Sequence, residues 1–330
     1  MEIDDYTVIK SLGEGSFGEV FLCSKKESTI KYVIKKYDKS KLTEENKKYF
    51  DNEISILKDI NHQNIIKLYE VKEKEKDIYV IEEYCNGGAL DKFLEYYLKK
   101  KKEPLSEEIV QHIMRQLIDA IKYLHGKKIM HRDLKNENIL LNYEDEKSRE
   151  NKDIMKAKIK IIDFAFARYL KEGELAKSIL GCPLNMSPYI LNGLISTKKN
   201  KNIGYNEKEE IWTLGTICYE LLTGEPLFNA ENLEDLANKV DKGDYYLPLT
   251  LSKETISFLN SMLQYDSEKR LSAAQLSNHD FLKKNISEFK KIDINELKNV
   301  KIINKPTILI NTKENESIWE NFGKGIEGSN

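Results

Sequence analysis

The residues best suited to chemistry lie in IMHRDLKNENILL, residues 129–141. An aspartate (Asp133) is followed two positions later by a lysine (Lys135) and five positions later by an asparagine (Asn138). A carboxylate can take the proton of an attacking hydroxyl, and an ammonium can neutralise a phosphoryl group during its transfer. A carboxamide oxygen is a neutral ligand for Mg²⁺. This ordered set therefore predicts phosphoryl transfer.

Three further charged residues fit the same chemistry. Asp163, in KIIDFAFARYL (residues 160–170), offers the hard anionic oxygen that Mg²⁺ prefers. Lys35 lies in the strand-like YVIKKY and Glu53 in the helical stretch that follows, so the lysine can neutralise phosphate oxygens while the glutamate orients it. Taken singly, each of these two is more simply a surface charge. They gain meaning only together with the rest of the set.

A glycine-rich stretch, GEGSFGEV, precedes these residues and contains Gly13, Gly15 and Gly18. Glycines let backbone N–H groups approach a polyphosphate without obstruction by a Cβ atom. Alone the signal is weak, because a glycine-rich hairpin is often only a turn. Strand-like sequence on both sides argues against a dinucleotide-binding fold, in which a helix would follow.

The elements that must position these groups are strands and one helix at first, and helices later. Runs rich in β-branched and aromatic residues predict strands over residues 6–13, 19–26, 31–38, 65–73 and 77–85. Apolar residues at helical spacing predict one main helix within residues 42–60. A small β-rich half followed by a larger helical half predicts an α+β fold class.

In the helical half, residues 106–126 carry an apolar stripe, with Ser106 as N-cap and Gly126 as a stop signal. Further helices are predicted over residues 208–223, 252–264 and 272–278. The charged segment 142–158 predicts a solvated loop between two short strands. Periodicity is lost from about residue 285 onward, which predicts a tail.

Composition limits the function classes. The 330 residues are 40% hydrophobic and 33% charged, as in ordinary globular proteins. A net charge of −2 argues against nucleic acid as the main partner, and no apolar run reaches membrane-spanning length. The four cysteines have neither metal-site nor disulfide spacing, which fits a reducing compartment. These cysteines are Cys23, Cys85, Cys182 and Cys218. We expect a cytoplasmic or nuclear protein and prefer the cytoplasmic location.

Over residues 6 to about 283, the motifs and their spacing resemble those of the eukaryotic protein kinases. The resemblance implies a bilobal fold, with an N-lobe over residues 1–84, a C-lobe over 85–283 and a tail over 284–330. Lys135 marks the serine/threonine type. YCNGGAL, the long insert before KIKIIDF, and the FARYL that follows are similar to the autophagy-initiating (ULK) kinases. The implied partners are protein substrates and regulatory proteins.

The resemblance also assigns residues and cofactors. ATP and Mg²⁺ are the implied cofactors. Asp133 would be the catalytic base and Lys135 its neighbouring cation, while Lys35 would contact the α- and β-phosphates with Glu53 as its helix partner. Asn138 and Asp163 would hold the metal. The nucleotide would lie between the lobes, and its site would comprise Leu12, Gly13, Gly15, Gly18, Val20, Val33, Lys35, Glu83, Cys85, Leu140 and Ile162.

Control by phosphorylation is a further implication. Arg132 would bind a phosphate on the activation segment, since a guanidinium fork suits bidentate phosphate binding. Ser178 aligns with the family's phosphorylated position, although an unmodified loop serine is an equal alternative. Cys182 replaces the usual threonine or serine before the substrate site, and a thiol is a poorer hydrogen-bonding partner.

Several other positions depart from the family pattern. Ala165 replaces the glycine of the Asp-Phe-Gly turn, which costs roughly 1–2 kcal/mol if φ there is positive and little if φ is negative. Glu82 stands at the apolar gatekeeper position, where it either pairs with a cation such as Lys35 or has a raised pKa. Such a pair would compete with Glu53 and favour an inactive arrangement.

Two departures concern the C-lobe. Tyr189 stands where a glutamate usually pairs with Arg270. We expect the tyrosine to stack on the guanidinium or to form a hydrogen bond close to it. Glu210 replaces a helix aspartate, and we expect its longer side chain to repack while the carboxylate keeps its contacts.

The preferred function is protein kinase, because the principal catalytic residues are kept. A weakly nucleotide-binding pseudokinase scaffold is the alternative, and a small-molecule phosphotransferase is disfavoured by HRDLK and its spacing.

Overall fold

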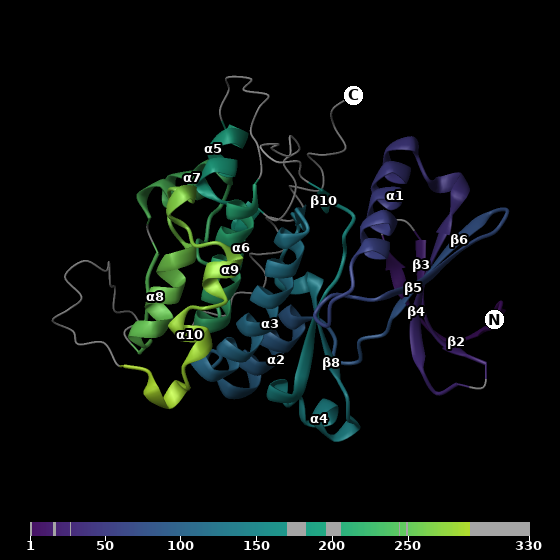
Figure 1. Cartoon of the computed structure of the whole chain (residues 1–330), viewed down its shortest axis with the longest axis horizontal. Coiled ribbons are helices and arrows are strands. Elements are labelled where there is room, and N and C mark those ends of the chain that lie inside the picture. Colours follow the sequence, from purple (N-terminus) through teal and green to yellow (C-terminus); the bar gives the residue numbers. More distant parts are fainter. Residues whose placement is uncertain are drawn as a thin grey trace.

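The computed structural model describes residues 2–15, 18–26, 28–169, 183–195, 206–243, 245–248 and 250–290. A β-rich lobe with one long helix lies on the right of Figure 1, and a mostly helical lobe lies on the left. The predicted bilobal α+β fold is therefore confirmed.

The N-lobe sheet contains the five predicted strands and one short strand that the sequence did not predict. All neighbouring strands are antiparallel, so short turns suffice between consecutive strands, except where the main helix intervenes. The order across the sheet is β1 (Glu2–Ile3), β2 (Tyr6–Gly15), β3 (Gly18–Lys25), β4 (Lys31–Asp38), β6 (Asp77–Glu83) and β5 (Leu68–Glu73).

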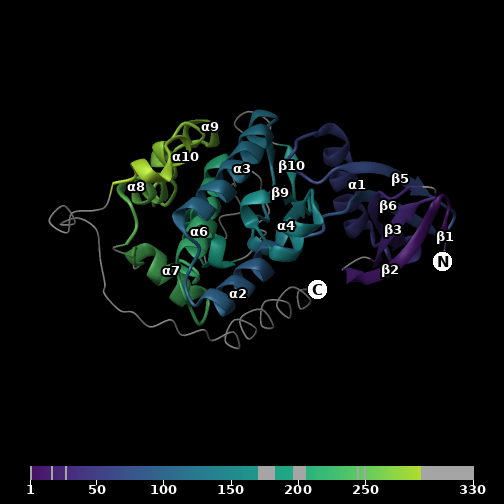
Figure 2. The same ribbon diagram turned by 90° about the horizontal axis from the view of Figure 1, so that it is seen from below.

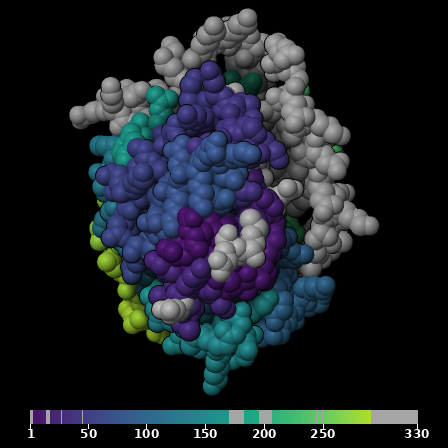
Figure 3. All heavy atoms as spheres, turned by 90° about the vertical axis from the view of Figure 1, so that its right-hand side faces the viewer, coloured from purple at the N-terminus to yellow at the C-terminus, as the bar shows by residue number. Residues whose placement is uncertain are grey.

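The main helix of the N-lobe, α1 (Glu44–Asp59), begins at the N-cap Thr43, whose side chain accepts a hydrogen bond from the Asn46 N–H. Phe50 and Ile54 of α1 pack with Tyr37 and Val80 on one face of the sheet. The side chains of a strand alternate between its faces, so the opposite face holds a separate cluster; its members are Ile3, Tyr6, Phe21, Cys23, Ile34, Tyr79 and Ile81. In Figure 3 this lobe faces the viewer.

The C-lobe is built around α3 and α6, whose apolar residues dominate the largest core. Figure 2 shows the arrangement of the helices from below. The helices are α2 (Leu90–Lys101), α3 (Glu107–Gly126), α4 (Glu146–Asn151), α5 (Pro188–Ile195), α6 (Glu207–Thr223), α7 (Leu233–Lys242), α8 (Lys253–Met262), α9 (Ala273–Leu276) and α10 (Asp280–Lys283). The described part of this lobe also contains two short antiparallel strand pairs, β7 (Ile129–Met130) with β10 (Arg168–Tyr169), and β8 (Ile139–Tyr143) with β9 (Ala157–Ile161).

The predicted helix boundaries are confirmed to within a few residues. Ser106 caps α3, where its hydroxyl accepts a hydrogen bond from the Ile109 N–H. Asn206 caps α6 in the same way, and the helix ends at Gly224, whose φ of +78° suits glycine. Ser252 and Ser272 are the N-caps of α8 and α9.

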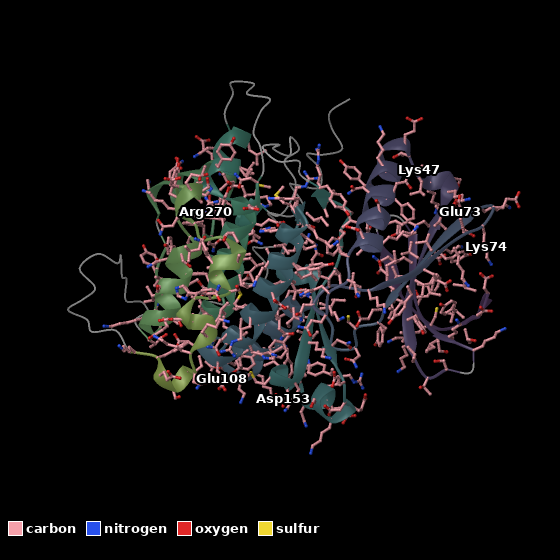
Figure 4. The ribbon with its side chains drawn as sticks, viewed as in Figure 1. Lys47, Glu73, Lys74, Glu108, Asp153 and Arg270 are labelled. Atoms are coloured by element: carbon pink, nitrogen blue, oxygen red, sulfur yellow. The ribbon has the colours of Figure 1, made fainter. Side chains whose placement is uncertain are left out.

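The prediction of a solvated loop over residues 142–158 is wrong in part. Asp145 accepts a hydrogen bond from the Ser148 N–H and so caps the short helix α4. Ile154 then anchors the segment, because its side chain is buried. Asp153, labelled in Figure 4, lies on the exposed side of the same connection.

Packing continues beyond residue 283, the predicted end of the C-lobe. The backbone N–H of Lys290 donates to Glu254, and the Lys290 carbonyl accepts from the Lys253 N–H. The ring of Phe289 lies 5.7 Å from that of Phe281. The rest of the predicted tail, residues 291–330, lies outside the described residues. Within the described residues, no helix is long and apolar enough to span a membrane.

Candidate active site

The loop between β7 and β8 brings the first predicted group together. Asp133 is buried, and its Oδ2 lies 3.0 Å from Lys135 Nζ. The 3₁₀ turn Asn136–Asn138 returns the chain, so that Asn138 Nδ2 donates to both the backbone carbonyl and the Oδ2 of Asp133, each at 2.9 Å. The spacing of two and five residues thus places a carboxylate, an ammonium and a carboxamide in one contact set.

The two predicted metal ligands lie at the same end of the β8–β9 hairpin. Ile139 pairs with Ile161 in this hairpin, so Asn138 precedes one strand and Asp163 follows the other closely. The Ile162 N–H also donates to the Asn138 carbonyl at 3.0 Å. Because the amide nitrogen of Asn138 is directed to Asp133, its Oδ1 is the atom left for a cation. A carboxamide oxygen and a carboxylate are hard donors that fit Mg²⁺.

The turn after Asp163 tolerates alanine. The positive φ angles around the site belong to Arg132 (+66°) and Asp163 (+64°), and Ala165 is not among the described residues with positive φ. The energetic cost that a positive φ would give Ala165 therefore does not apply. Phe164 is buried against the ring of His131, 4.8 Å away edge-on, so the turn is firmly packed.

Lys35 and Glu53 form the predicted pair, but a third residue is closer. Lys35 Nζ lies 3.8 Å from Glu53 Oε1, and 3.1 and 3.2 Å from the two carboxylate oxygens of Glu82. Burial disfavours the charge of Lys35, yet Glu82 and then Glu53 outweigh burial and raise its pKa. Burial raises the pKa of Glu53 to about 7, with Lys35 opposing the rise and Glu82 and Asp163 adding to it. The predicted pairing of Glu82 with Lys35 is present.

The glycine-rich turn has a structural constraint that the sequence did not reveal. A Cβ atom at Gly18 would lie 1.8 Å from the Lys36 carbonyl oxygen of the neighbouring strand, so no side chain fits there. Gly13 has a φ of +140°, which disfavours other residues. Gly15 pairs with Gly18 where β2 and β3 meet. Close strand contact therefore explains Gly18 without reference to a phosphate.

The apolar residues predicted to line the nucleotide site are less buried than the core around them. Leu12 is 41% exposed, and the other four are half-buried, as expected for apolar side chains that a ligand would cover; they are Val20, Val33, Leu140 and Ile162. They come from β2, β3 and β4 of the N-lobe, from β8, and from the chain after β9. They therefore approach the junction from both lobes.

The connection between the lobes, residues 83–85, is fixed by an ion pair. Glu83 Oε2 lies 2.7 Å from Lys160 Nζ of β9, and the lysine is buried. The Glu83 N–H donates to the Lys67 carbonyl. Burial raises the pKa of Cys85 to about 12, so this thiol stays protonated at neutral pH. The pair ties the end of β6 to the strand that leads to Asp163.

Arg132 and Glu210 support the loop that carries Asp133. The Arg132 N–H donates to Glu210 Oε1 at 2.6 Å, and His125 Nε2 lies 2.7 Å from Glu210 Oε2. Burial pushes the pKa of Glu210 up, but His125 and the Arg132 N–H hold it below its ordinary value. The longer glutamate thus repacks as expected. Arg132 Nε donates to the Phe166 carbonyl at 2.7 Å.

Two residues singled out in the sequence, Ser178 and Cys182, lie outside the described residues.

Arg270 has a carboxylate partner that the sequence interpretation missed. Its Nη1 lies 3.0 Å from Glu209 Oε2, and its guanidinium carbon lies 5.2 Å from the centre of the Trp212 ring. Tyr189, the expected partner, is 46% exposed. Figure 4 labels Arg270 among the C-lobe helices. The signal in the sequence is the acidic pair Glu209 and Glu210 shortly before Trp212, of which only Glu210 was predicted to have a structural role.

A second contact that the sequence did not reveal lies beside the loop that carries Asp133. Asn136 Nδ2 donates to Glu220 Oε2 at 2.8 Å. Burial raises the pKa of Glu220 to about 7, and the negative charges of Glu137 and Asp91 add to the rise. Helix α6, helix α2 and the loop therefore bring three carboxylates near one another.

Comparison with known proteins agrees with this geometry. The family model described as protein kinase domain matches residues 6–282. Serine/threonine-protein kinase atg1 of Dictyostelium discoideum is 35% identical over 289 residues, which are 86% of this chain and 40% of that protein. Myosin light chain kinase A of the same organism is 32% identical over 86% of this chain and 89% of its own length. Calcium-dependent protein kinase 5 of Plasmodium falciparum is 35% identical over 86% of this chain and 45% of that protein.

Three conclusions follow from these matches. The chain spans less than half the length of the atg1 kinase and of the calcium-dependent kinase that it matches. The predicted likeness to an autophagy-initiating kinase is confirmed, and a calcium-dependent kinase matches at the same identity. With the family model covering both lobes and the site, the chain belongs to the protein kinase family.

Proposed function

We propose that this protein transfers the γ-phosphoryl group of ATP, with Mg²⁺, to serine or threonine hydroxyls of proteins. The observation that carries this proposal is the contact set of Asp133, Lys135 and Asn138. Asp163 lies at the same hairpin end as Asn138, where a metal ligand would be needed. Bound Mg-ATP supplies the phosphoryl group and the charge that screens it.

The roles of the side chains follow from their positions. Asp133 accepts the proton of the attacking hydroxyl, and Asn138 Nδ2 holds that carboxylate in one orientation at 2.9 Å. Lys135, 3.0 Å from Asp133 Oδ2, carries the positive charge that stabilises the phosphoryl group in transfer. Asn138 Oδ1 and the Asp163 carboxylate would hold Mg²⁺. Lys35 would bind the α- and β-phosphates, and its neighbours Glu53 and Glu82 keep it charged.

The acidic residues beside the loop that carries Asp133 support a basic substrate. The negative charges of Glu137 and Asp91 act on Glu220, and Glu137 belongs to the same loop as Asp133. A lysine or arginine of the substrate would relieve the unfavourable charge on Glu220, whose pKa is raised to about 7. We therefore propose that basic residues near the target hydroxyl favour phosphorylation.

Control by phosphorylation is also proposed. Arg132 lies one residue from Asp133, and the backbone of Arg168 pairs with that of Met130, two residues before Arg132. A phosphate on the activation segment, with Ser178 as the first candidate, would bind to Arg132. Regulatory proteins and a cytoplasmic location remain predictions from the sequence.

The test is transfer of labelled phosphate from ATP to a basic serine-containing peptide with Mg²⁺. The Asp133→Asn variant should lose activity by on the order of a hundredfold or more, because the base is removed. The matched control is Asp153→Asn, an exposed aspartate of the α4 connection, which should keep wild-type activity. Equal rates for the wild type and Asp133→Asn would refute the proposal and leave a nucleotide-binding scaffold.

A further inference from the structure

Lys35 is held more closely by a residue of its own sheet than by α1. Both carboxylate oxygens of Glu82 lie within 3.2 Å of Lys35 Nζ, whereas Glu53 of α1 reaches it with one oxygen at 3.8 Å. Both glutamates are buried, with 5% of Glu82 and 8% of Glu53 exposed. The nearer partner of the phosphate-binding lysine is therefore the residue at the gatekeeper position.

The backbone fixes the Lys35–Glu82 pair from both sides. Lys35 lies opposite Val80 and Glu82 opposite Val33 in the β4–β6 ladder, so the two charged residues are diagonal neighbours on one face. On its other side, β6 pairs with β5, where Glu82 lies opposite Leu68. The pair thus moves with the sheet. Glu53 instead moves with α1, a single helix packed on that sheet.

The electrostatics favour Glu82 as the main partner. Glu82 comes before Glu53 among the charges that raise the pKa of Lys35. The distances agree with this order, since Glu82 has both carboxylate oxygens within 3.2 Å of Lys35 Nζ and Glu53 has one at 3.8 Å. Lysine has three N–H donors, and Glu53 at 3.8 Å is beyond hydrogen-bond distance, so Glu82 alone can engage at most two donors and leaves one for a phosphate oxygen.

We propose that Glu82 is a positioning residue that keeps Lys35 at the phosphate-binding position whether or not α1 holds Glu53 in place. This inference rests on the proposed kinase function. It replaces the expectation that Glu82 merely competes with Glu53, because Lys35 lies within reach of both carboxylates at once. Movement of α1 then weakens catalysis without releasing Lys35.

The first experiment measures peptide phosphorylation by Glu53→Gln, Glu82→Gln and the double variant. Each single change should lower kcat/KM for ATP by about tenfold or less, and the double change by on the order of a thousandfold, because one remaining carboxylate still holds Lys35. The far-UV circular dichroism spectrum of all three should match that of the wild type, because partial unfolding would lower the active fraction and leave the KM for the peptide unchanged. Two results would overturn the proposal: Glu53→Gln as slow as the double variant, or Glu82→Gln faster than the wild type.

The second experiment needs no turnover and so separates this inference from the kinase function. Lys35 in the nucleotide-free protein is labelled with a trace of acetic anhydride, and the modified fraction is measured by mass spectrometry. Only the uncharged amine reacts, so loss of the main carboxylate partner increases labelling. Glu82→Gln should increase it several-fold more than Glu53→Gln. An equal or larger increase in Glu53→Gln would show that α1 is the main anchor and would overturn the proposal.

The matched control is Glu73→Gln. Glu73 Oε1 lies 2.7 Å from Lys39 Nζ at the end of β5, and its side chain is 70% exposed. Figure 4 labels it on the outer side of the N-lobe. This variant removes a glutamate partner of a lysine in the same lobe and should leave both kcat/KM and Lys35 labelling at wild-type values. If the wild type transfers no phosphate, the proposed function fails, and the labelling order still decides the role of Glu82.

Discussion

Replacing Arg270 with methionine should destabilise the C-lobe strongly. Arg270 is 1% exposed, and its Nη1 lies 3.0 Å from Glu209, which is also buried. The guanidinium also donates to the backbone carbonyls of Lys208, Gln264 and Tyr265 at 2.8–3.2 Å. Removing one partner of a buried pair leaves an uncompensated charge and costs about 3–5 kcal/mol.

The assay is urea unfolding monitored by fluorescence, with the melting temperature as a second measure. At about 2 °C per kcal/mol for a domain of this size, Arg270→Met should lower Tm by roughly 6–10 °C. The double variant Arg270→Met, Glu209→Met should recover much of the loss, because no charge remains buried. Tyr189→Ala, at a 46% exposed position, should cost far less. Two results would refute the assignment of Glu209 as the main partner of Arg270. One is an Arg270→Met protein as stable as the wild type, and the other is a Tyr189→Ala protein less stable than Arg270→Met.

Three further changes test other parts of the structure. Gly18→Ala should lower Tm and the affinity for ATP, measured by thermal shift, because its Cβ would lie 1.8 Å from the Lys36 carbonyl oxygen; unchanged values would show that the turn can shift. Lys160→Met should cost about 1–3 kcal/mol in urea unfolding, because Glu83 then lacks its buried counter-ion. Burial raises the pKa of Glu220 from 4.5 to about 7, so its contribution to stability is fully present below pH 4.5 and is lost as pH rises through 7. Glu220→Gln should therefore flatten the dependence of Tm on pH over that interval, and an unchanged slope would contradict the raised pKa.

The elements and the contact set of Asp133, Lys135 and Asn138 were predictable because their signals are local. Ser106 and the apolar stripe behind it determine where α3 begins, and alternation or β-branched content marks each long strand. The spacing of Asp133, Lys135 and Asn138 also sufficed, since a single 3₁₀ turn joins them. Short-range geometry translates directly from sequence to structure.

What the sequence did not reveal depends on contacts between distant segments. Glu209 and Arg270 are 61 positions apart, and nothing local distinguishes Glu209 from the neighbouring Glu210. The constraint on Gly18 comes from the carbonyl of Lys36, in the next strand. Helix α4 was not predicted because its residues are polar and charged, so they show no apolar periodicity that would mark Asp145 as an N-cap. Tertiary packing, rather than propensity, decides these features.

The most direct test of the central claim is a single-turnover measurement with enzyme in excess over ATP. It reports the phosphoryl-transfer step without product release. If Asp133 is the base in a working site, Asp133→Asn should slow this step by about 10²–10⁴-fold while ATP affinity, measured separately, stays at the wild-type value. Equal single-turnover rates for the two proteins would contradict the account.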